Sequence, residues 1–505
     1  MEKGFWETGA TKNNTVLQIS YSPTVWTATS VLFLSLLLIS LLLISLIPLG
    51  FDSFGSFGIV KIVKGMGVNL ADYLGSAIIR LEEHFWFYIP LGIVGIWRWL
   101  VWGVKKTGAA LYKPIPAEDS SNYTLSIITP VYDEDPETFH LALQSWERNK
   151  PDEIIAVIDE RDKDCIRVFQ TFSKKRSWAK LIITPKPGKR QALADGILEA
   201  KSEIVALVDS DTIWDPKMKE KLLPPFSNPA IGGVTPRNHP VRRQSIWEKM
   251  TDVFWDIRNY YDLPSQTAIG SALTCLTGRT SLYRREILVP KLAEFLNEIL
   301  LGKRKESGED KCLTRLIQRD GWKTYYQSTA VIYSVAASDF KTFITQRLRW
   351  TRNSHNSDLV SLLDGWAWRH PYLAFYMIDR FISTFTLFLG PIFLGISIYY
   401  HQFTVTLAIL ALWMVGRGIK ILPHLRRRPE DIPLVPIFVV INFLMALIKL
   451  YALITIREQK WIREHYQLKG LGHKTREIAL AKIKDMILTT EIIASMVIFV
   501  VYVLR

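Results

Sequence analysis

The hydrophobic pattern divides the chain into two strongly apolar blocks with a long polar stretch between them. Residues 25–51 contain no charged side chain and exceed the roughly 20 apolar residues that cross a bilayer as a helix. This run is too long for the apolar core of a signal peptide, so we expect it to be retained. Residues 85–104 predict a second span, which Lys105 and Lys106 end.

Three or four further spans are expected after the polar stretch. Residues 381–400 and 486–504 are long enough to cross a bilayer. Residues 403–415 are short for a span. The span becomes longer if Arg417 and Lys420 belong to it and their long side chains place the charges at the interface.

Residues 432–448 either cross the bilayer or lie along its inner surface. The segment that follows, 457–485, carries eight Lys and Arg against four acids, yet simple alternation of spans would place it outside. Because basic segments stay on the cytoplasmic side, we favour the interfacial alternative. The same rule, applied to Lys105, Lys106 and the basic cluster at 417–428, predicts a multi-pass plasma (inner) membrane protein with a cytoplasmic central stretch.

From about Tyr123 the pattern changes to short apolar runs that alternate with amphipathic segments. The expected buried strands are 125–131, 153–158, 180–184 and 203–208, and the expected helices are 136–148, 165–172 and 190–200. Such alternation predicts an α/β domain with a mostly parallel sheet and right-handed crossovers. Ligands of such sheets bind at the carboxyl ends of the strands.

Four regions are therefore expected. They are an N-terminal membrane region with two spans (1–110), a cytoplasmic α/β domain (111–340), an interfacial helix (341–370) and a C-terminal membrane region (371–505) with a basic segment near 449–484. Trp247 and the apolar residues that follow it at helical spacing predict a helix that packs this domain against the membrane region.

The net charge of +14 has two interpretations. The basic residues orient the spans and attract anionic lipid, or they bind acidic substrates or an acidic product. Nucleic acid is a poor third candidate, since no basic helix is free of apolar flanks. The three cysteines are odd in number and lack paired spacing, which argues against disulfides and structural zinc.

Acidic and basic residues follow the expected strands, and no Gly-rich nucleotide motif does. Lys189 and Arg190 open a helix after the third strand, where cations and free amides suit a diphosphate. Asp209 and Asp211 follow the fourth strand, and paired carboxylates there suit Mg²⁺ or Mn²⁺. The alternative is that Asp211 only caps a helix.

Two later motifs carry further polar chemistry. Glu309 and Asp310 begin a predicted helix; the helix dipole alone favours acids there, but Asp310 also suits a general base. Gln346, Arg349 and Trp350 share one helical face, which suits a sugar and a diphosphate. An interfacial helix with Trp at headgroup depth is the alternative.

The ordered motifs Asp209-Ser210-Asp211, Gly308-Glu309-Asp310 and Gln346-Arg347-Leu348-Arg349-Trp350 resemble those of processive family 2 glycosyltransferases, the hyaluronan, chitin and cellulose synthases. The resemblance covers about residues 123–463 and is closest to hyaluronan synthases. It implies a GT-A-like domain inserted in a helical membrane region. It also implies that a β-linked polymer, made from nucleotide-sugars such as UDP-GlcNAc and UDP-GlcA, leaves through the protein's own channel.

The resemblance also implies roles for individual residues. Asp211 becomes the ligand of Mg²⁺ or Mn²⁺, and Asp310, beside Glu309, becomes the base. The remaining implied residues are Tyr132, Glu134, Asp159, Lys189, Arg190 and Asp209 for the nucleotide-sugar, Cys275, Gln346, Arg347, Arg349 and Trp350 for the acceptor and diphosphate, and Trp461 and Arg463 for gating.

Two departures leave the sugar open. The acceptor-side Ser-Gly-Pro of the family is replaced around Cys275, and Gly-Thr after Trp461 is missing. A capsule, alginate, chitin or other β-glycan synthase is therefore an alternative, and a single-transfer enzyme acting on a lipid carrier or a transporter is a more distant one.

Overall fold

The structure, a computed structural model, describes residues 94–117, 123–186, 188–300, 303–456 and 458. The expected spans at 25–51 and 486–504, the start of the one at 85–104, and both Trp461 and Arg463 lie outside the described residues.

The first half of the α/β domain is a parallel sheet. β1 (Leu125–Val131) lies between β2 (Glu153–Asp159) and β4 (Ile204–Val208), and β3 (Ala179–Thr184) lies beyond β2. The expected strands are confirmed to within one residue at each end, as is their parallel direction. Their carboxyl ends therefore meet at one edge.

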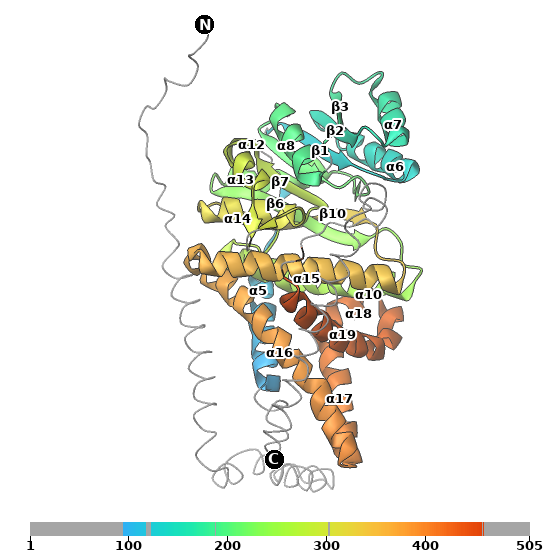
Figure 1. Cartoon of the computed structure of the whole chain (residues 1–505), viewed down its shortest axis with the longest axis vertical. Coiled ribbons are helices and arrows are strands. Elements are labelled where there is room, and N and C mark those ends of the chain that lie inside the picture. The colour runs from blue at the N-terminus through green and yellow to red at the C-terminus, as the bar shows by residue number, and fades with distance from the viewer. Residues whose placement is uncertain (1–93, 118–122, 187, 301–302, 457, 459–505) are drawn as a thin grey trace, which may run out of the picture.

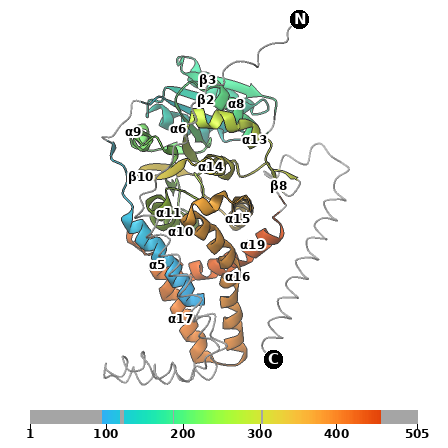
Figure 2. The same ribbon diagram turned by 90° about the vertical axis from the view of Figure 1, so that its left-hand side faces the viewer.

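Helices cover both faces of this sheet, which explains the unbroken apolar runs of its strands. α6 (Pro136–Glu147) and α7 (Lys163–Ser173) pack on the face that buries Ile127, and α8 (Lys189–Glu199) packs on the face that buries Ile128. Figures 1 and 2 show these helices on opposite sides of the strands. Each fully buried large apolar side chain contributes about 1.5–3 kcal/mol.

The second half of the sheet is mixed. β7 (Thr280–Arg284) pairs antiparallel with β4, and β6 (Ile231–Pro240), β10 (Lys323–Ser334) and β5 (Ile213–Trp214) complete the order β3-β2-β1-β4-β7-β6-β10-β5. α14 (Glu309–Arg319) packs on the same face as α8. The domain is thus α/β and mostly parallel, as expected.

Short elements fill the connections. They are α9 (Met218–Leu222), η4 (Pro224–Ser227), α12 (Arg285–Leu288), η6 (Val289–Lys291), α13 (Leu292–Leu296), β8 (Ile299–Leu300), β9 (Lys303–Arg304), η7 (Trp366–Arg369), α18 (Leu422–Arg427) and η8 (Pro429–Leu434).

Two long helices lie crosswise beneath the sheet domain. α15 (Phe340–Leu363) and α10 (Ile246–Ile257) form this layer, and a π-helical stretch (Arg258–Asp262) leads from α10 into α11 (Leu263–Gly270). Figure 1 shows the layer between the sheet above and a group of descending helices below. Trp247 of α10 packs on Phe343 of α15, as the apolar spacing predicts.

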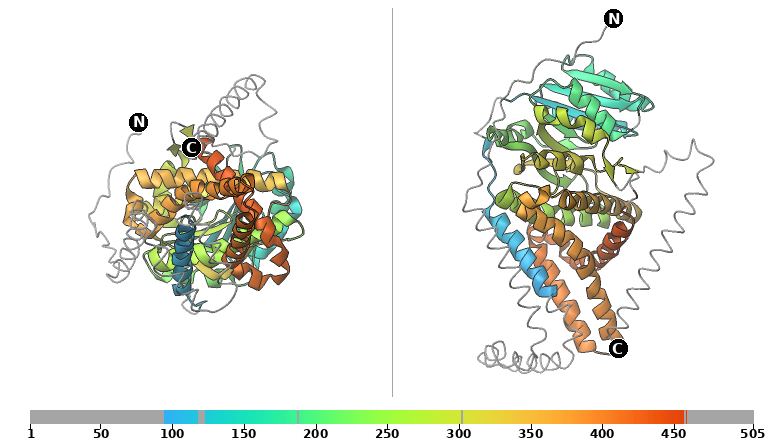
Figure 3. Two further views of the ribbon diagram at one scale, coloured as in Figure 1. Left: turned by 90° about the horizontal axis from the view of Figure 1, so that it is seen from below. Right: turned by 60° about the vertical axis from the view of Figure 1, so that its left-hand side comes forward.

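The descending helices are α5 (Gly95–Leu111), α16 (Pro371–Tyr399), α17 (Phe403–Lys420) and α19 (Val435–Ile454). Among the described residues, two segments are long and apolar enough to cross a bilayer, Pro371–Tyr399 and Pro429–Ile454. An 18-residue stretch within each has a mean hydropathy of 2.0 and 2.4, respectively. Figure 3 shows α16 and α17 projecting away from the sheet domain. Figure 2 shows α19 oblique to α16.

A buried ionic cluster joins the crosswise layer to the helices below. His424 of α18 places Nδ1 2.7 Å from Asp256 and Nε2 3.0 Å from Asp431. Arg427 pairs with Asp252 at 2.7 Å and with Asp256 at 2.6 Å. Since all three carboxylates are almost fully buried, these partners are what make their burial tolerable.

Candidate active site

One cavity of about 1520 Å³ runs from the carboxyl ends of the parallel strands, past α14 and α15, to α5, α16, α17 and α19. Every site residue expected from the sequence and present among the described residues lines it. These are Tyr132, Glu134, Asp159, Lys189, Arg190, Asp209, Asp211, Cys275, Glu309, Asp310, Gln346, Arg347, Arg349 and Trp350.

Carboxylates gather where β1 and β4 end. Glu134 accepts a hydrogen bond from Ser210 at 2.7 Å, which joins the two strand ends. Burial, followed by the nearby charges of Asp209 and Glu134, raises the pKa of Asp211 to about 6. Excess negative charge held on hard oxygen ligands fits a divalent cation such as Mg²⁺ or Mn²⁺.

Asp159 has a partner that the sequence did not reveal. Arg161, two residues further on, binds its carboxylate through Nε at 2.7 Å and Nη2 at 2.6 Å. The same guanidinium lies 5.8 Å from the ring centre of Tyr132. The side chains of β1 and β2 are therefore in contact, with the carboxylate of Asp159 held by a cation.

Lys189 joins the strand ends at the cavity to α14. Its Nζ lies 2.6 Å from Asp209 Oδ1 and 2.5 Å from Glu309 Oε1. Burial alone would raise the pKa of Glu309, but the charge and hydrogen bond of Lys189 outweigh it and lower that pKa to about 2. Glu309 is thus an ionised partner of Lys189.

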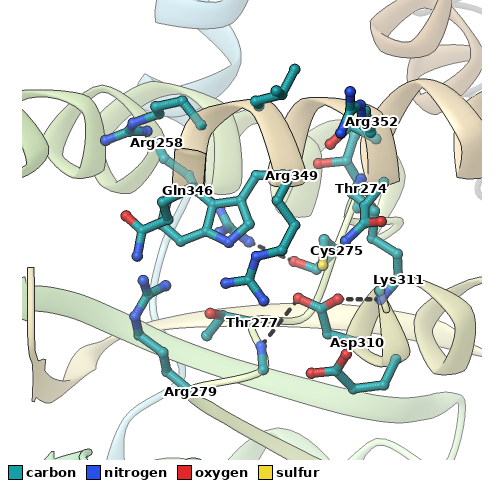
Figure 4. A pocket seen from close by; sticks show the side chains of 18 of the residues that line it. Arg258, Thr274, Cys275, Thr277, Arg279, Asp310, Lys311, Gln346, Arg349 and Arg352 are labelled. Carbon is teal, nitrogen blue, oxygen red and sulfur yellow. Dashed lines mark hydrogen bonds between the residues drawn. The ribbon is translucent and has the colours of Figure 1, made fainter. Parts of the chain in front are cut away.

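Asp310 lies in the first turn of α14 and faces the cavity. Its Oδ1 accepts from the Lys311 backbone N at 2.8 Å and its Oδ2 from the Gly278 backbone N at 3.3 Å. Gly308, the N-cap, has φ +78°, a conformation that favours glycine. Figure 4 shows the Asp310 carboxylate and the Arg349 guanidinium directed into the same space.

The α15 face is built around Trp350. The guanidinium carbons of Arg279 and Arg347 lie 5.1 and 5.2 Å from its ring centre. Burial, followed by the charge of Arg279, lowers the pKa of Arg347 to about 9. Gln346, Arg349 and Trp350 all line the cavity, and so do Arg347 and Leu348 between them.

Sequence reasoning missed other cations of the acceptor region. Arg258 donates to the Cys275 carbonyl at 2.8 Å, and Lys311 donates to the Thr274 carbonyl at 3.3 Å. Figure 4 shows Arg258 and Arg279 on the Gln346 side of the cavity. Arg258 begins the π-helical stretch, a distortion that is frequent at functional sites but that a periodicity of 3.6 does not reveal.

A second group of metal-binding residue types lies away from this cavity. Ligand atoms of His239, Asp252 and Asp256 lie within 4.8 Å of one another. Their carboxylates already pair with Arg427 at 2.7 and 2.6 Å. Because cations already neutralise the negative charge of these carboxylates, we assign this group a structural role.

The central part of the chain matches a known protein family. Residues 125–353 match the family model described as "Glycosyltransferase like family 2". This match covers the sheet, Asp211, Asp310 and the Gln346–Trp350 motif. The chain therefore contains a family 2 glycosyltransferase domain, and the protein is a glycosyltransferase.

Named relatives cover most of the chain. A type 2 glycosyltransferase of Zymoseptoria tritici is 26% identical over 398 residues, or 75% of this chain and 83% of the relative. Hyaluronan synthase of Streptococcus pyogenes is 24% identical over 403 residues, which are 77% of this chain and 94% of the relative. A mannosyltransferase of Pyrobaculum calidifontis, solved with GDP-Man and Mn²⁺, has a TM-score of 0.48 at 18% identity, covering 73% of this chain and 97% of that one.

Proposed function

We propose that this protein is a processive, inverting glycosyltransferase that polymerises a β-linked polysaccharide from nucleotide-sugars. The observation that carries the proposal is the continuity of the cavity. Its lining includes the strand-end acids, then Asp310, then Trp350, and finally side chains of α5, α16, α17 and α19. A chain extended at Asp310 has a path past Trp350 toward these helices.

In this proposal Asp310 takes the proton from the acceptor hydroxyl as that oxygen attacks the anomeric carbon. The new bond joins the acceptor oxygen to the anomeric carbon, the bond to the diphosphate oxygen breaks, and the nucleoside diphosphate leaves. Attack opposite the leaving group inverts the configuration, so an α-linked donor gives a β-linkage. A positioned base of this kind contributes about 10² to 10⁴ in rate.

The strand-end residues hold the donor. Asp211, close to Asp209 and Glu134, would hold Mg²⁺ or Mn²⁺, which when bound stabilises the charge of the departing diphosphate. Tyr132, Asp159 and Lys189 line the same end and take the nucleoside and ribose.

The charge of the cavity supports an acidic product of the hyaluronan type, made from UDP-GlcNAc and UDP-GlcA. The lining cations contributed by α5, α16, α17 and α19 are Arg98, Lys105, Arg380, Arg417, Lys420 and Lys449. Two acids line this part of the cavity. Asp262 pairs with Lys105 at 3.2 Å, and Asp379 pairs with Arg98. The surplus of positive charge attracts a carboxylate-bearing chain.

The membrane arrangement is part of the proposal. α16 and α17 cross the plasma (inner) membrane, the sheet domain is cytoplasmic, and α19 lies near the inner interface beneath α15. The obliquity of α19 to α16 (Figure 2) supports this placement. The polymer leaves among these helices without a separate exporter.

Purified full-length protein, incubated with UDP- and GDP-sugars singly and in pairs with MgCl₂ or MnCl₂, tests the function. The expected result is a long polymer that requires UDP-GlcNAc and UDP-GlcA together. Polymer from one sugar alone would identify another β-glycan synthase, such as a chitin, capsule or alginate enzyme. A single sugar on an extracted lipid would refute processivity.

A further inference from the structure

Arg190 lines the cavity, but its guanidinium is bound to the segment that precedes α14. Nη1 donates to the Phe295 carbonyl at 2.7 Å, and Nη2 donates to Glu298 at 2.7 Å and to the Ser307 carbonyl at 3.2 Å. Arg190 itself is 5% exposed. Three of the five N–H groups of this guanidinium are therefore bound within the protein, and its Nε is buried.

Glu298 is the centre of this cluster. Besides Arg190, it pairs with Arg315 at 2.9 Å and with Lys305 at 3.5 Å. Burial alone would raise the pKa of Glu298, but Lys305, then Arg190 and Arg315, outweigh it and lower the pKa to about 2. All four side chains are buried, so three cations share one carboxylate in the protein interior.

The cluster contacts described residues that precede α14. Lys305 N donates to the Glu298 carbonyl at 2.9 Å. Ser307 is held on two sides: its carbonyl accepts from Arg190, and its Oγ donates to Asn353 of α15 at 2.9 Å. Three residues after Ser307 comes Asp310.

We propose that Arg190 and Glu298 are positioning residues of the transferase, which fix the Ser307–Gly308 turn and thereby the carboxylate of Asp310. Arg190 follows Lys189, whose Nζ already contacts Glu309. The start of α8 therefore holds the start of α14 at two neighbouring points. The inference rests on the proposed role of Asp310 as base.

Arg190→Met separates this role from donor binding. Glu298 keeps Arg315 and Lys305 as partners, so the variant is expected to fold. If Arg190 positions Asp310, kcat falls about 10- to 100-fold, because a misplacement near 1 Å costs up to about 10². The KM for UDP-GlcNAc and UDP-GlcA, and the calorimetric affinity for UDP with MnCl₂, stay unchanged.

Arg190→Lys adds a second test. A lysine keeps the charge beside Glu298 but cannot bind the Phe295 and Ser307 carbonyls together with it. The expected kcat therefore lies between those of Arg190→Met and the wild type. The double variant Glu298→Gln/Arg315→Met leaves fewer unpaired cations than Glu298→Gln alone. We expect it to have a reduced kcat and an unchanged KM.

Arg319→Met is the matched control. Arg319 lies on the same helix α14 and forms a two-pronged pair with Glu294 at 2.6 and 2.7 Å, but both side chains are partly exposed and far along the helix from Asp310. Its kcat is expected to equal that of the wild type.

Three results would overturn the inference. Wild-type kcat in Arg190→Met would remove the positioning role, and a raised donor KM with unchanged kcat would make Arg190 a donor ligand. Undiminished polymerisation by Asp310→Asn would remove the base and the inference with it. An inactive Asp310→Asn beside a fully active Arg190→Met would reject this inference alone and leave the proposed function standing.

Discussion

Replacing Lys189 by methionine should destabilise the protein in a pH-dependent manner. The ion pair between Lys189 and Glu309 lowers the pKa of Glu309 from an ordinary 4.5 to about 2. This difference in pKa corresponds to about 3 kcal/mol of folding stability at neutral pH. Leaving one partner of a mostly buried ion pair alone costs about 3–5 kcal/mol, so two independent estimates agree.

The sign follows from the lowered pKa. A carboxyl group with a depressed folded-state pKa stabilises the fold fully above its unfolded value, near 4.5, and loses that contribution as the pH falls through about 2. The difference between wild type and Lys189→Met should therefore be about 3 kcal/mol at pH 7 and about half of that at pH 3.

Thermal unfolding of the full chain in detergent, followed by tryptophan fluorescence at several pH values, measures this difference. A loss of about 3 kcal/mol corresponds to roughly 6–12 °C in Tm for a domain of this size. The double variant Lys189→Met/Glu309→Gln should recover the part of the loss that comes from Glu309, since Glu309 then carries no unpaired charge. Asp209 also loses its contact with Lys189 in this variant, but its side chain is 30% exposed.

Lys180→Met is the control, because Lys180 also contacts two carboxylates, Glu153 at 2.9 Å and Glu199 at 3.1 Å. Its side chain is 26% exposed and that of Glu199 48%, so the expected loss is about 0–1 kcal/mol. Equal losses in the two variants, or a Lys189→Met loss that stays constant from pH 7 to pH 3, would refute the reasoning.

Three further predictions concern activity. Asp310→Asn should lower UDP release about 10²- to 10⁴-fold with UDP affinity unchanged, whereas Asp364→Asn, at the exposed end of α15, should be fully active; weaker UDP binding by Asp310→Asn would argue against a base. EDTA should abolish wild-type activity and MnCl₂ should restore it, but Asp211→Asn should not be restored; recovery of that variant would move the metal elsewhere. Trp350→Ala should shorten the polymer on agarose gels at an unchanged initial rate of UDP release, and products of normal length would remove Trp350 from the chain's path.

The strands around the donor end could be predicted from sequence because each is buried on both faces. A segment such as β4, with five apolar residues and no polar interruption, is readable from composition alone. Its parallel direction follows from the alternation of strands and helices, whereas its position beside β1 was not predicted. Asp209 and Asp211 then had to lie at the cavity, since the strand ends there.

The partners of these acids could not be predicted, because they come from distant or irregular segments. Arg279 precedes β7, an antiparallel strand that follows the irregular stretch after α11. Glu298, the partner of Arg190, lies in a short segment without periodicity. The sequence predicted that Lys189 and Arg190, at the start of α8, would both bind a diphosphate. In the structure Lys189 contacts Asp209, whereas Arg190 contacts a loop more than 100 residues away.

The ionic cluster of Asp252, Asp256, Asp431, His424 and Arg427 has a consequence for cutting this protein into parts. A fragment that ends before Pro371 keeps Asp252 and Asp256 but loses His424 and Arg427, which come from α18. Asp256 would then lose both of these partners, whereas Asp252 would lose Arg427 but keep Arg243 at 2.8 Å. The transferase portion is therefore not a portable module, and its enzymology belongs to the intact polypeptide.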